Sequence, residues 1–194
     1  MSDLIPEVVA PLLRGRLGTP YRFVTSCSST QRLIDEGDLE GTTVVTDHQT
    51  QGRGRLGRVW EDTPGRSLLV SVLLTPRPPM PLWPQLSLVA GEAVAVALRQ
   101  QTGVDATLRH PNDVVVAGRK LVGVLPEASR GRVVLGIGVN VNQTAEELPT
   151  DTVKPPTSLR VELGHEVERA PLLATILLEL ERAYDEWSAP YFAR

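Results

Sequence analysis

The sequence predicts an α+β fold with a mixed, mainly antiparallel sheet and helices on one face of it. Residues 104–142 consist of short segments rich in β-branched residues, separated by pairs of turn residues. The segment SLLVSVLL (67–74) is nearly all apolar, as in a strand that is covered on both faces. Two longer segments, at about 83–102 and 171–187, have the apolar spacing of amphipathic helices. Strands that follow one another with few helices between them favour antiparallel pairing.

The N-terminal part is expected to hold two strands and two short helices. A helix over SSTQRLIDEGD (28–38) would have Ser28 or Ser29 as its N-cap and would end near Gly37. Three prolines in the first twenty residues limit the first helix to a short segment and a turn. In order, the expected elements are a short helix within 1–20, a strand at 21–26, the helix at 28–38 and a strand at 42–47.

The second half of the chain is expected to contain hairpins and then helices. The pairs Ala117-Gly118 and Arg130-Gly131 have the composition of hairpin turns. Pro126 has no backbone donor, so its strand is expected to lie at a sheet edge or to break there. In order, the expected elements are a helix at about 83–102 ending at Gly103, strands within 105–110, 113–118, 119–128 and 132–142, and helices at 157–164 and 171–187, the last with Pro171 in its first turn.

The composition is that of a single globular domain over residues 1–194, in which 1–20 form an N-terminal extension. A net charge of −3 argues against a general nucleic-acid binder, which would be basic. The single cysteine, Cys27, excludes an internal disulfide and a multi-cysteine metal site and indicates a reducing compartment. No stretch reaches the roughly 18 uninterrupted apolar residues of a membrane span, and the N-terminus does not resemble a signal peptide. We therefore expect a cytoplasmic protein without a membrane segment.

The segment QGRGRLGRVW (51–60) is the most unusual part of the chain. Three glycines and three arginines fall between Gly52 and Arg58 with no acid among them. Glycine lets a backbone approach a ligand closely, and arginine binds phosphate oxygens with two parallel donors. We expect this segment to be mobile without a ligand and to order around an anion, with Trp60 able to stack on a planar ring. A solvated basic loop would have the same composition, so the segment alone leaves both interpretations open.

Five motifs occur in a fixed order along the chain. Together they resemble the catalytic domain of biotin protein ligases, also called biotin–acetyl-CoA-carboxylase ligases, over about residues 21–187. The resemblance implies a fold of the class II aminoacyl-tRNA synthetase/biotin ligase type. The motifs are SSTQ (28–31), DHQTQGRGRLGRVW (47–60), RHPNDV (109–114), KLVGVLPE (120–127) and GIGVNVN (136–142).

The resemblance implies an ATP-dependent ligase that works in two steps. Biotin would be activated as biotinyl-5′-AMP with release of pyrophosphate, and Mg²⁺ would accompany ATP. The biotinyl group would then pass to a specific lysine of a biotin carboxyl carrier protein domain. A glycine-arginine loop suits this chemistry, because it can shield a reactive adenylate from water and stabilise charge on the phosphoryl oxygens.

The resemblance also assigns site residues by position, and it assigns no metal ligands. Catalytic roles fall on Arg55, Arg109 and Asp113. Biotin contacts fall on Ser29, Thr30, Gln31, Gln49, Gly52, Arg53, Gly54, Arg55, Arg109, Gly123 and Gly136. Nucleotide contacts fall on Arg55, Arg58, Trp60, Asn112, Lys120 and Asn140. Simpler roles stay open for several of them: helix capping for Ser29 and Thr30, a solvated hairpin position for Lys120, and a strand-end turn for Asn140.

The motif RHPND (109–113) departs from the family's usual Lys-Trp-Pro-Asn-Asp. Arg109 keeps the positive charge of the lysine, but it cannot release a proton and its planar head has a different shape. His110 could act as a general base toward the incoming amine, or it could be a packing residue. Asp113 is the better candidate for orienting that amine or accepting its proton, although aspartate is also common after such a turn.

Two segments that many family members carry are not expected in this chain. Residues before 21 are too few for a winged-helix DNA-binding domain, and those after 187 are too few for the small C-terminal β-barrel. We therefore expect no DNA binding, while a homodimer stays open. The alternative functions are a lipoate or octanoate ligase or transferase of the same fold, with Cys27 a poor fit for its thioester nucleophile, and a non-catalytic biotin-binding homologue.

Overall fold

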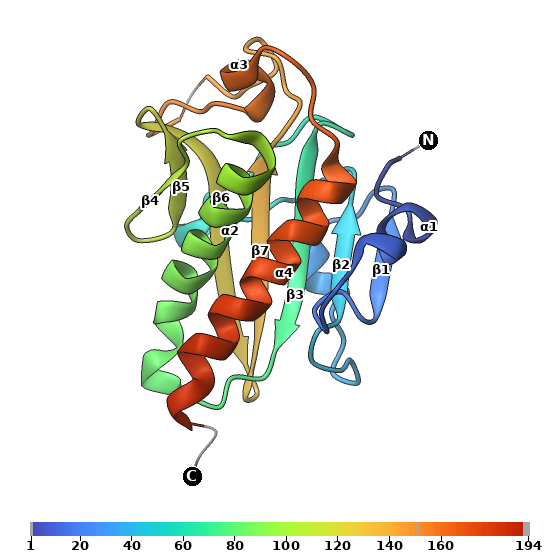
Figure 1. The fold of residues 1–194 in the computed structure, drawn as a ribbon, viewed down its shortest axis with the longest axis vertical. Helices are drawn as coiled ribbons and strands as arrows, with labels where there is room; N and C mark the ends of the chain where they lie inside the picture. Colours follow the sequence, from blue (N-terminus) through green and yellow to red (C-terminus); the bar gives the residue numbers. More distant parts are fainter. Residues whose placement is uncertain (1, 151, 192–194) are drawn as a thin grey trace.

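The computed structural model describes residues 2–150 and 152–191, and a single seven-stranded sheet runs through them in the order β1-β2-β3-β7-β6-β5-β4 (Figure 1). Only β1 and β2 pair in parallel, and every other neighbouring pair of this sheet is antiparallel. The predicted mixed, mainly antiparallel sheet is therefore confirmed. The strands are β1 (Tyr21–Val24), β2 (Thr43–Thr46), β3 (Ser67–Leu74), β4 (Thr107–Arg109), β5 (Asp113–Val116), β6 (Arg119–Ser129) and β7 (Arg132–Asn140).

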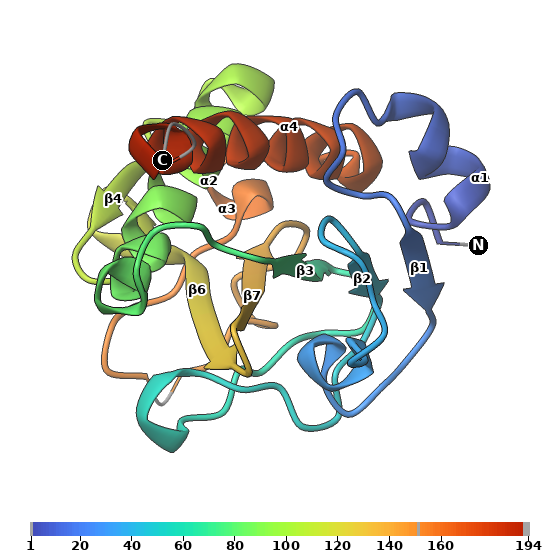
Figure 2. The same ribbon diagram turned by 90° about the horizontal axis from the view of Figure 1, so that it is seen from below.

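The two long helices lie side by side on one face of the sheet, and the segments between β1 and β3 lie on the other (Figure 2). Side chains that alternate along β3 and β7, such as Val70, Val72, Leu135 and Ile137, join the helices in one apolar core. The α-helices are α1 (Pro6–Val9), α2 (Leu86–Thr102), α3 (Leu159–Leu163) and α4 (Arg169–Ser188). The prediction of helices on one face is confirmed.

The apolar character of α2 is explained by its place in this core. The stretch Met80–Thr102 is long and apolar enough to cross a membrane by composition, but 56% of its most apolar window is buried inside the protein. A 3₁₀ helix, η4 (Met80–Gln85), leads into α2, which ends at Gly103 with a φ of 73°. Glycine adopts this left-handed conformation without strain, as expected for the residue after a helix.

The predicted helix over 28–38 is wrong. Only a short 3₁₀ helix, η2 (Thr30–Leu33), forms there, Ser29 makes no capping hydrogen bond, and the chain turns extended at Ile34. The reason is that buried polar side chains tie the segment to the sheet. Thr30 Oγ1 lies 2.7 Å from Ser71 Oγ, and Gln31 Nε2 donates to the carbonyl oxygen of Leu125 at 3.1 Å. Serine, threonine and glutamine therefore serve contacts to β3 and β6 here and do not serve a helix.

Both predicted hairpin turns are present. Ala117 and Arg130 have φ values of 48° and 51°, and each is followed by a glycine with positive φ, which is the pattern of tight two-residue hairpins. Pro126 does not break β6, where it pairs with Leu135 of β7. β5 pairs with β6 no further than Gly123, so Pro126 lies on a locally free edge, as its missing donor requires.

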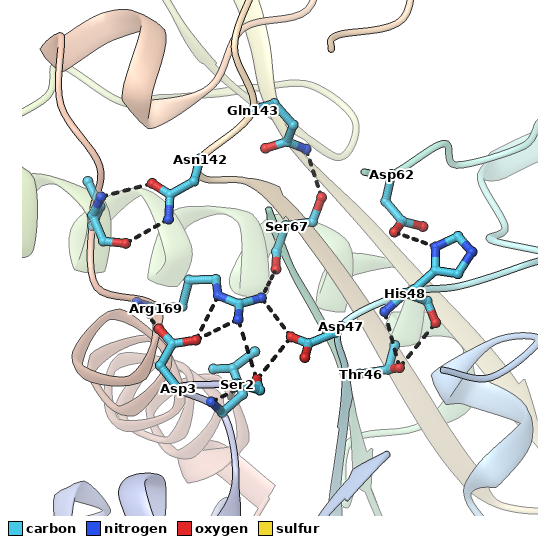
Figure 3. Close-up of polar contacts among 12 residues, drawn as sticks. Ser2, Asp3, Thr46, Asp47, His48, Asp62, Ser67, Asn142, Gln143 and Arg169 are labelled. Atoms are coloured by element: carbon cyan, nitrogen blue, oxygen red, sulfur yellow. Dashed lines mark hydrogen bonds and ion pairs between the residues drawn. The ribbon is translucent and has the colours of Figure 1, made fainter. Parts of the chain in front are cut away.

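A buried arginine ties the start of α4 to the N-terminal segment and the sheet (Figure 3). Arg169 is only 5% exposed and forms ion pairs with Asp3 and Asp47. It also donates to the carbonyl oxygen of Ser67 at 3.0 Å, and its backbone N–H donates to Asp3 Oδ2 at 3.0 Å. Asp3 thus caps α4 from far away in the sequence, because Glu168 at the N-cap makes no side-chain cap.

Candidate functional site

A cavity of about 670 Å³ opens on the face of the sheet that the long helices leave uncovered. Its floor comes from β3, β6 and β7, and its walls come from η2, the Gly/Arg loop (residues 51–60), the β4–β5 turn and the segment 149–156. The cavity therefore collects residues from at least five separate parts of the chain. Four of the five sequence motifs reach it through several residues each, and β6 with the fifth motif supplies its floor.

Three glycines keep the floor of the cavity flat. A Cβ atom at Gly138 would lie 2.7 Å from Cε2 of Trp60, and one at Gly123 would lie 2.7 Å from its Cζ3. At Gly136, a Cβ would lie 3.0 Å from Cδ of Gln31. The indole ring of Trp60 and the amide of Gln31 therefore rest directly on the backbone of β6 and β7, which only glycine permits.

The Gly/Arg loop folds back on itself as a small hairpin over the cavity. Trp60 N–H donates to the carbonyl oxygen of Gly52 at 3.0 Å, and Gly54 N–H donates to that of Arg58 at 2.7 Å. Leu56 at the tip is 87% exposed and has a φ of 57°. The described conformation is a folded one, and the expected mobility of the ligand-free loop stays a prediction.

Two arginines of the loop contact the opposite wall of the cavity. Arg53 forms an ion pair with Glu127 of β6, and Nη1 of Arg55 donates to Oδ1 of Asn112 at 3.1 Å. Asn112 in turn donates to the carbonyl oxygen of Val124 at 2.8 Å, which fixes its amide. Both contacts cross the cavity, so the loop covers it even without an anion present.

The polar end of the cavity is built on Thr30 and Gln49. The Oε1 atom of Gln49 accepts from the backbone N–H of Thr30 at 2.8 Å, which orients its amide. The backbone N–H of Gln49 donates to Asp62 Oδ1 at 3.2 Å, and Asp62 Oδ2 lies 3.0 Å from His48 Nδ1 (Figure 3). The side chain of Asp62 is fully buried, so this carboxylate holds the segment that carries Gln49 in place.

The cationic end of the cavity is organised by Asp113, which is 4% exposed. Its Oδ1 lies 3.0 Å from Nζ of Lys120, and its Oδ2 accepts from Nζ of Lys154. Burial acts to raise the pKa of this carboxyl, but the two lysines outweigh it and hold the pKa below its usual range. The ammonium of Lys120 also lies 5.5 Å from the centre of the Trp60 ring, which places a cation on an aromatic face.

This arrangement combines a flat floor, a basic lid, a polar end and a cationic end. A model of the biotin/lipoate A/B protein ligase family matches residues 24–143 of the chain, which is more than half of it. The chain belongs to the biotin/lipoate A/B protein ligase family. The predicted family membership is confirmed, and the matched region holds the floor, the lid and the polar end.

Curated relatives and solved structures of the biotin/lipoate ligase family agree with this assignment. The chain is 38% identical over 169 residues to the bifunctional ligase/repressor BirA of Bacillus spizizenii, a match that covers 82% of this chain and 52% of the relative. It is 36% identical over 168 residues to the biotin–[acetyl-CoA-carboxylase] ligase of Mycobacterium tuberculosis, covering 84% of this chain and 61% of the relative. The chain thus spans about half to three fifths of these relatives.

Similar backbones are known for biotin protein ligases. The structure of the ligase from Aquifex aeolicus in complex with biotin and ATP has a TM-score of 0.79 and is 35% identical, covering 88% of this chain and 72% of that one. The ligase from Leishmania major with biotinyl-5-AMP has a TM-score of 0.72 at 24% identity, which supports the fold. The predicted biotin ligase-type fold is therefore confirmed.

Most of the residues that the family resemblance assigned to the site lie together. All of them except Gly52 and Arg109 line the cavity. Gly52 supports the lid through its backbone contact with Trp60. Arg109 is exposed at the end of β4, the outermost strand, where it pairs with Asp113 in backbone register. Arg109 thus lies one strand further out than the cavity wall, and His110 beside it is exposed as well.

Two other family positions have structural partners that the motifs did not reveal. The amide of Asn140 donates to the carbonyl oxygen of Thr157 at 3.0 Å and accepts from Gln143 at 3.1 Å, so it braces the segment before α3. Lys154 is a cavity residue that none of the motifs contains. Its one sequence signal is its rarity, because only two of the 20 basic residues of the chain are lysines.

Proposed function

We propose that this chain activates biotin with ATP to form biotinyl-5′-AMP and then transfers the biotinyl group to a lysine of a biotin carboxyl carrier protein domain. The observation that carries the proposal is the glycine-floored cavity closed by the Gly/Arg loop. A flat floor suits planar rings, and arginines in a lid suit a phosphate between them. The printed names of the relatives and of the similar structures, which include biotin, ATP and biotinyl-5-AMP, support the same chemistry.

In the first step, a carboxylate oxygen of biotin attacks the α-phosphorus of ATP. A bond between that oxygen and phosphorus forms, and the bond from the α-phosphorus to the bridging oxygen breaks, so pyrophosphate leaves with its electrons. Negative charge grows on the phosphoryl oxygens during the attack. Arg53, Arg55 and Lys120 line the cavity and provide fixed donors for that charge, and Trp60 provides a ring surface for the adenine.

In the second step, the amine of the carrier lysine attacks the carbonyl carbon of the mixed anhydride. A C–N bond forms, AMP leaves with the electrons of the C–O bond, and the amine loses a proton. The lowered pKa of Asp113 makes its carboxylate a weak proton acceptor. We therefore assign Asp113 the role of orienting charged groups and do not assign it the role of general base.

Magnesium belongs to the proposal as the companion of ATP. Among residues 2–150 and 152–191, no group of three or more His, Cys, Asp or Glu side chains is arranged to hold a metal ion. The phosphates of ATP would therefore provide the main ligands of Mg²⁺, as is usual for this ion. We place the reaction in the cytoplasm, because its co-substrate is ATP, while a homodimer and the absence of DNA binding stay predictions.

The first prediction concerns the acid that is activated. Biotin is expected to drive exchange of labelled pyrophosphate into ATP, because adenylate formation is reversible on the enzyme. Lipoate and octanoate are tested in parallel at the same concentration, followed by transfer to an isolated carrier domain measured as a mass increase. Exchange with lipoate or octanoate in place of biotin would establish the alternative within the family. Biotin binding without exchange would leave a non-catalytic biotin binder.

A cysteine nucleophile does not favour the alternative of an acyl transferase. Burial raises the pKa of the Cys27 thiol, which keeps the reactive thiolate scarce at neutral pH. Cys27 also lies outside the residues that line the cavity. An octanoyl transfer through a thioester would thus lack its nucleophile at this position.

The second prediction concerns the lid. Arg53→Ala is expected to speed the loss of biotinyl-5′-AMP from the protein by about 10- to 100-fold, because it removes a charge-assisted contact of the lid. Retention is measured by rapid gel filtration followed by quantification of the bound adenylate. The matched control is Arg182→Ala on α4, whose side chain is 64% exposed on the helical face. Equal retention in both variants and in the wild type would mean that the loop does not act as a lid.

A further inference from the structure

The two lysines of this chain meet at one carboxylate. Eighteen of its 20 basic residues are arginines, and only Lys120 and Lys154 are lysines. In the structure Lys120 contacts Oδ1 of Asp113 and Lys154 contacts Oδ2. A chain that uses arginine in its other Lys/Arg ion pairs keeps lysine at this single point, inside the cavity.

The backbone brings the two lysines together. The N–H of Lys120 donates to the carbonyl oxygen of Pro155 at 2.8 Å, and the N–H of Thr157 donates to that of Lys120 at 2.8 Å. The segment around Pro156 therefore lies along the start of β6 as a short parallel bridge. Thr152 Oγ1 also donates to the carbonyl oxygen of Lys154 at 2.8 Å. Lys154 is thus held on a braced segment that follows the cavity wall.

The cationic end carries more positive charge than its partner neutralises. One carboxylate, on Asp113, faces two ammonium groups. The ammonium of Lys120 has a second partner in the ring of Trp60, whereas the contact printed for the ammonium of Lys154 is Asp113 alone. The arginines of the lid differ, because Arg53 pairs with Glu127 and Arg55 with Asn112. Lys154 is therefore the cavity cation best placed to accept an anionic ligand.

We propose that Lys154 binds the phosphate groups of ATP in this cavity, positioned by Asp113, and that it provides the charge that the sequence resemblance assigned to Arg109. The proposal rests on the proposed function for the use of ATP. Arg109 is exposed on the edge strand outside the cavity lining, while Lys154 lies within that lining. A lysine head is a compact charge on a flexible stem, so it can leave a carboxylate oxygen for a phosphate oxygen with a small movement.

The experiment compares Lys154→Gln and Lys154→Arg with the wild type in two measurements. Calorimetry measures the binding of MgATP and, separately, of biotin, and pyrophosphate exchange measures the reaction. Lys154→Gln is expected to weaken MgATP binding by about 10- to 100-fold and to leave biotin binding within about twofold, because a charge-assisted contact is lost at the phosphates only. Lys154→Arg is expected to restore part of the MgATP affinity. A general loss of structure would instead weaken both ligands and lower the Tm.

The outcomes separate this proposal from the proposed function. Exchange absent in the wild type, together with MgATP binding that depends on Lys154, would overturn the biotin ligase function and keep the phosphate-binding role. Unchanged MgATP affinity and exchange in Lys154→Gln would overturn the role of Lys154. A loss confined to Arg109→Gln would also overturn it, because Arg109 would then be the cation that reaches the phosphates. Arg182→Gln serves as the control for removing a positive charge elsewhere.

Discussion

Replacing Gly52 by alanine is expected to lower the rate of biotinyl-5′-AMP formation by about 100-fold, because reacting groups displaced by about 1 Å lose that much rate. A Cβ atom at this position would lie 2.2 Å from the carbonyl oxygen of Trp60, which is backbone and cannot rotate away. The base of the lid must therefore open, and Trp60 would be displaced from its place on Gly123 and Gly138. The measurement is single-turnover adenylate formation at saturating biotin and ATP.

Gly54→Ala is the matched control for this change. A Cβ atom at Gly54 would lie 3.4 Å from the carbonyl oxygen of Arg58, and the φ of Gly54 is −115°, which alanine adopts freely. This variant adds the same methyl group to the same loop without the clash, so its rate is expected to stay within about threefold, a barrier change of under about 1 kcal/mol. Equal rates in the two variants would show that the geometry at the base of the lid does not govern the reaction.

Removing the buried arginine at the start of α4 is expected to lower the free energy of unfolding by about 3–5 kcal/mol, the usual effect of breaking a buried ion pair. In Arg169→Met, Asp47 and Asp3 would keep their charges without the guanidinium, and the carbonyl oxygen of Ser67 would lose a donor. Since domains of this size are stable by only about 5–15 kcal/mol, the loss would be a large share of the total. Urea unfolding followed by circular dichroism measures it.

Arg182→Met on the same helix is the matched control. Arg182 is mostly exposed and pairs only with Glu179 one turn away, so its replacement is expected to change the free energy of unfolding by less than about 0.5 kcal/mol. If Arg169→Met lowered stability no more than this control, the ion pairs of Arg169 would contribute little to the fold. The core under α4 would then be sufficient to hold the helix in place.

The sheet and the long helices could be predicted because their local patterns and their tertiary roles agree. Ala117-Gly118 and Arg130-Gly131 required positive φ, and both turns join strands as predicted. The β-branched and apolar residues of β3 predicted a strand covered on both faces, and every residue of β3 is buried. Family resemblance then located most cavity residues, since each motif sits at the point where its strand or loop meets the floor.

The failures of prediction share a different physical origin. SSTQRLIDEGD has good local helix signals, but the buried contacts of Thr30 and Gln31 with the sheet override them. Lys154 belongs to no motif and reaches the cavity only because Lys120 pairs with Pro155 and Thr157, a long-range backbone contact. Arg109 was assigned by its place in a motif, while its exposure depends on β4 being the edge strand. Such contacts between distant segments are not encoded in local patterns.

The confinement of both lysines to the cavity has a consequence for the enzyme's exposure to its own product. An acyl adenylate that escapes into solution acylates amines, whereas guanidinium groups, always protonated, are not nucleophiles at neutral pH. Outside the cavity, the basic side chains that this chain presents to solvent are arginines and histidines. Its outer surface is therefore chemically inert toward a leaked acylating agent, and accidental self-labelling is restricted to the chain terminus and the two amines held by Asp113.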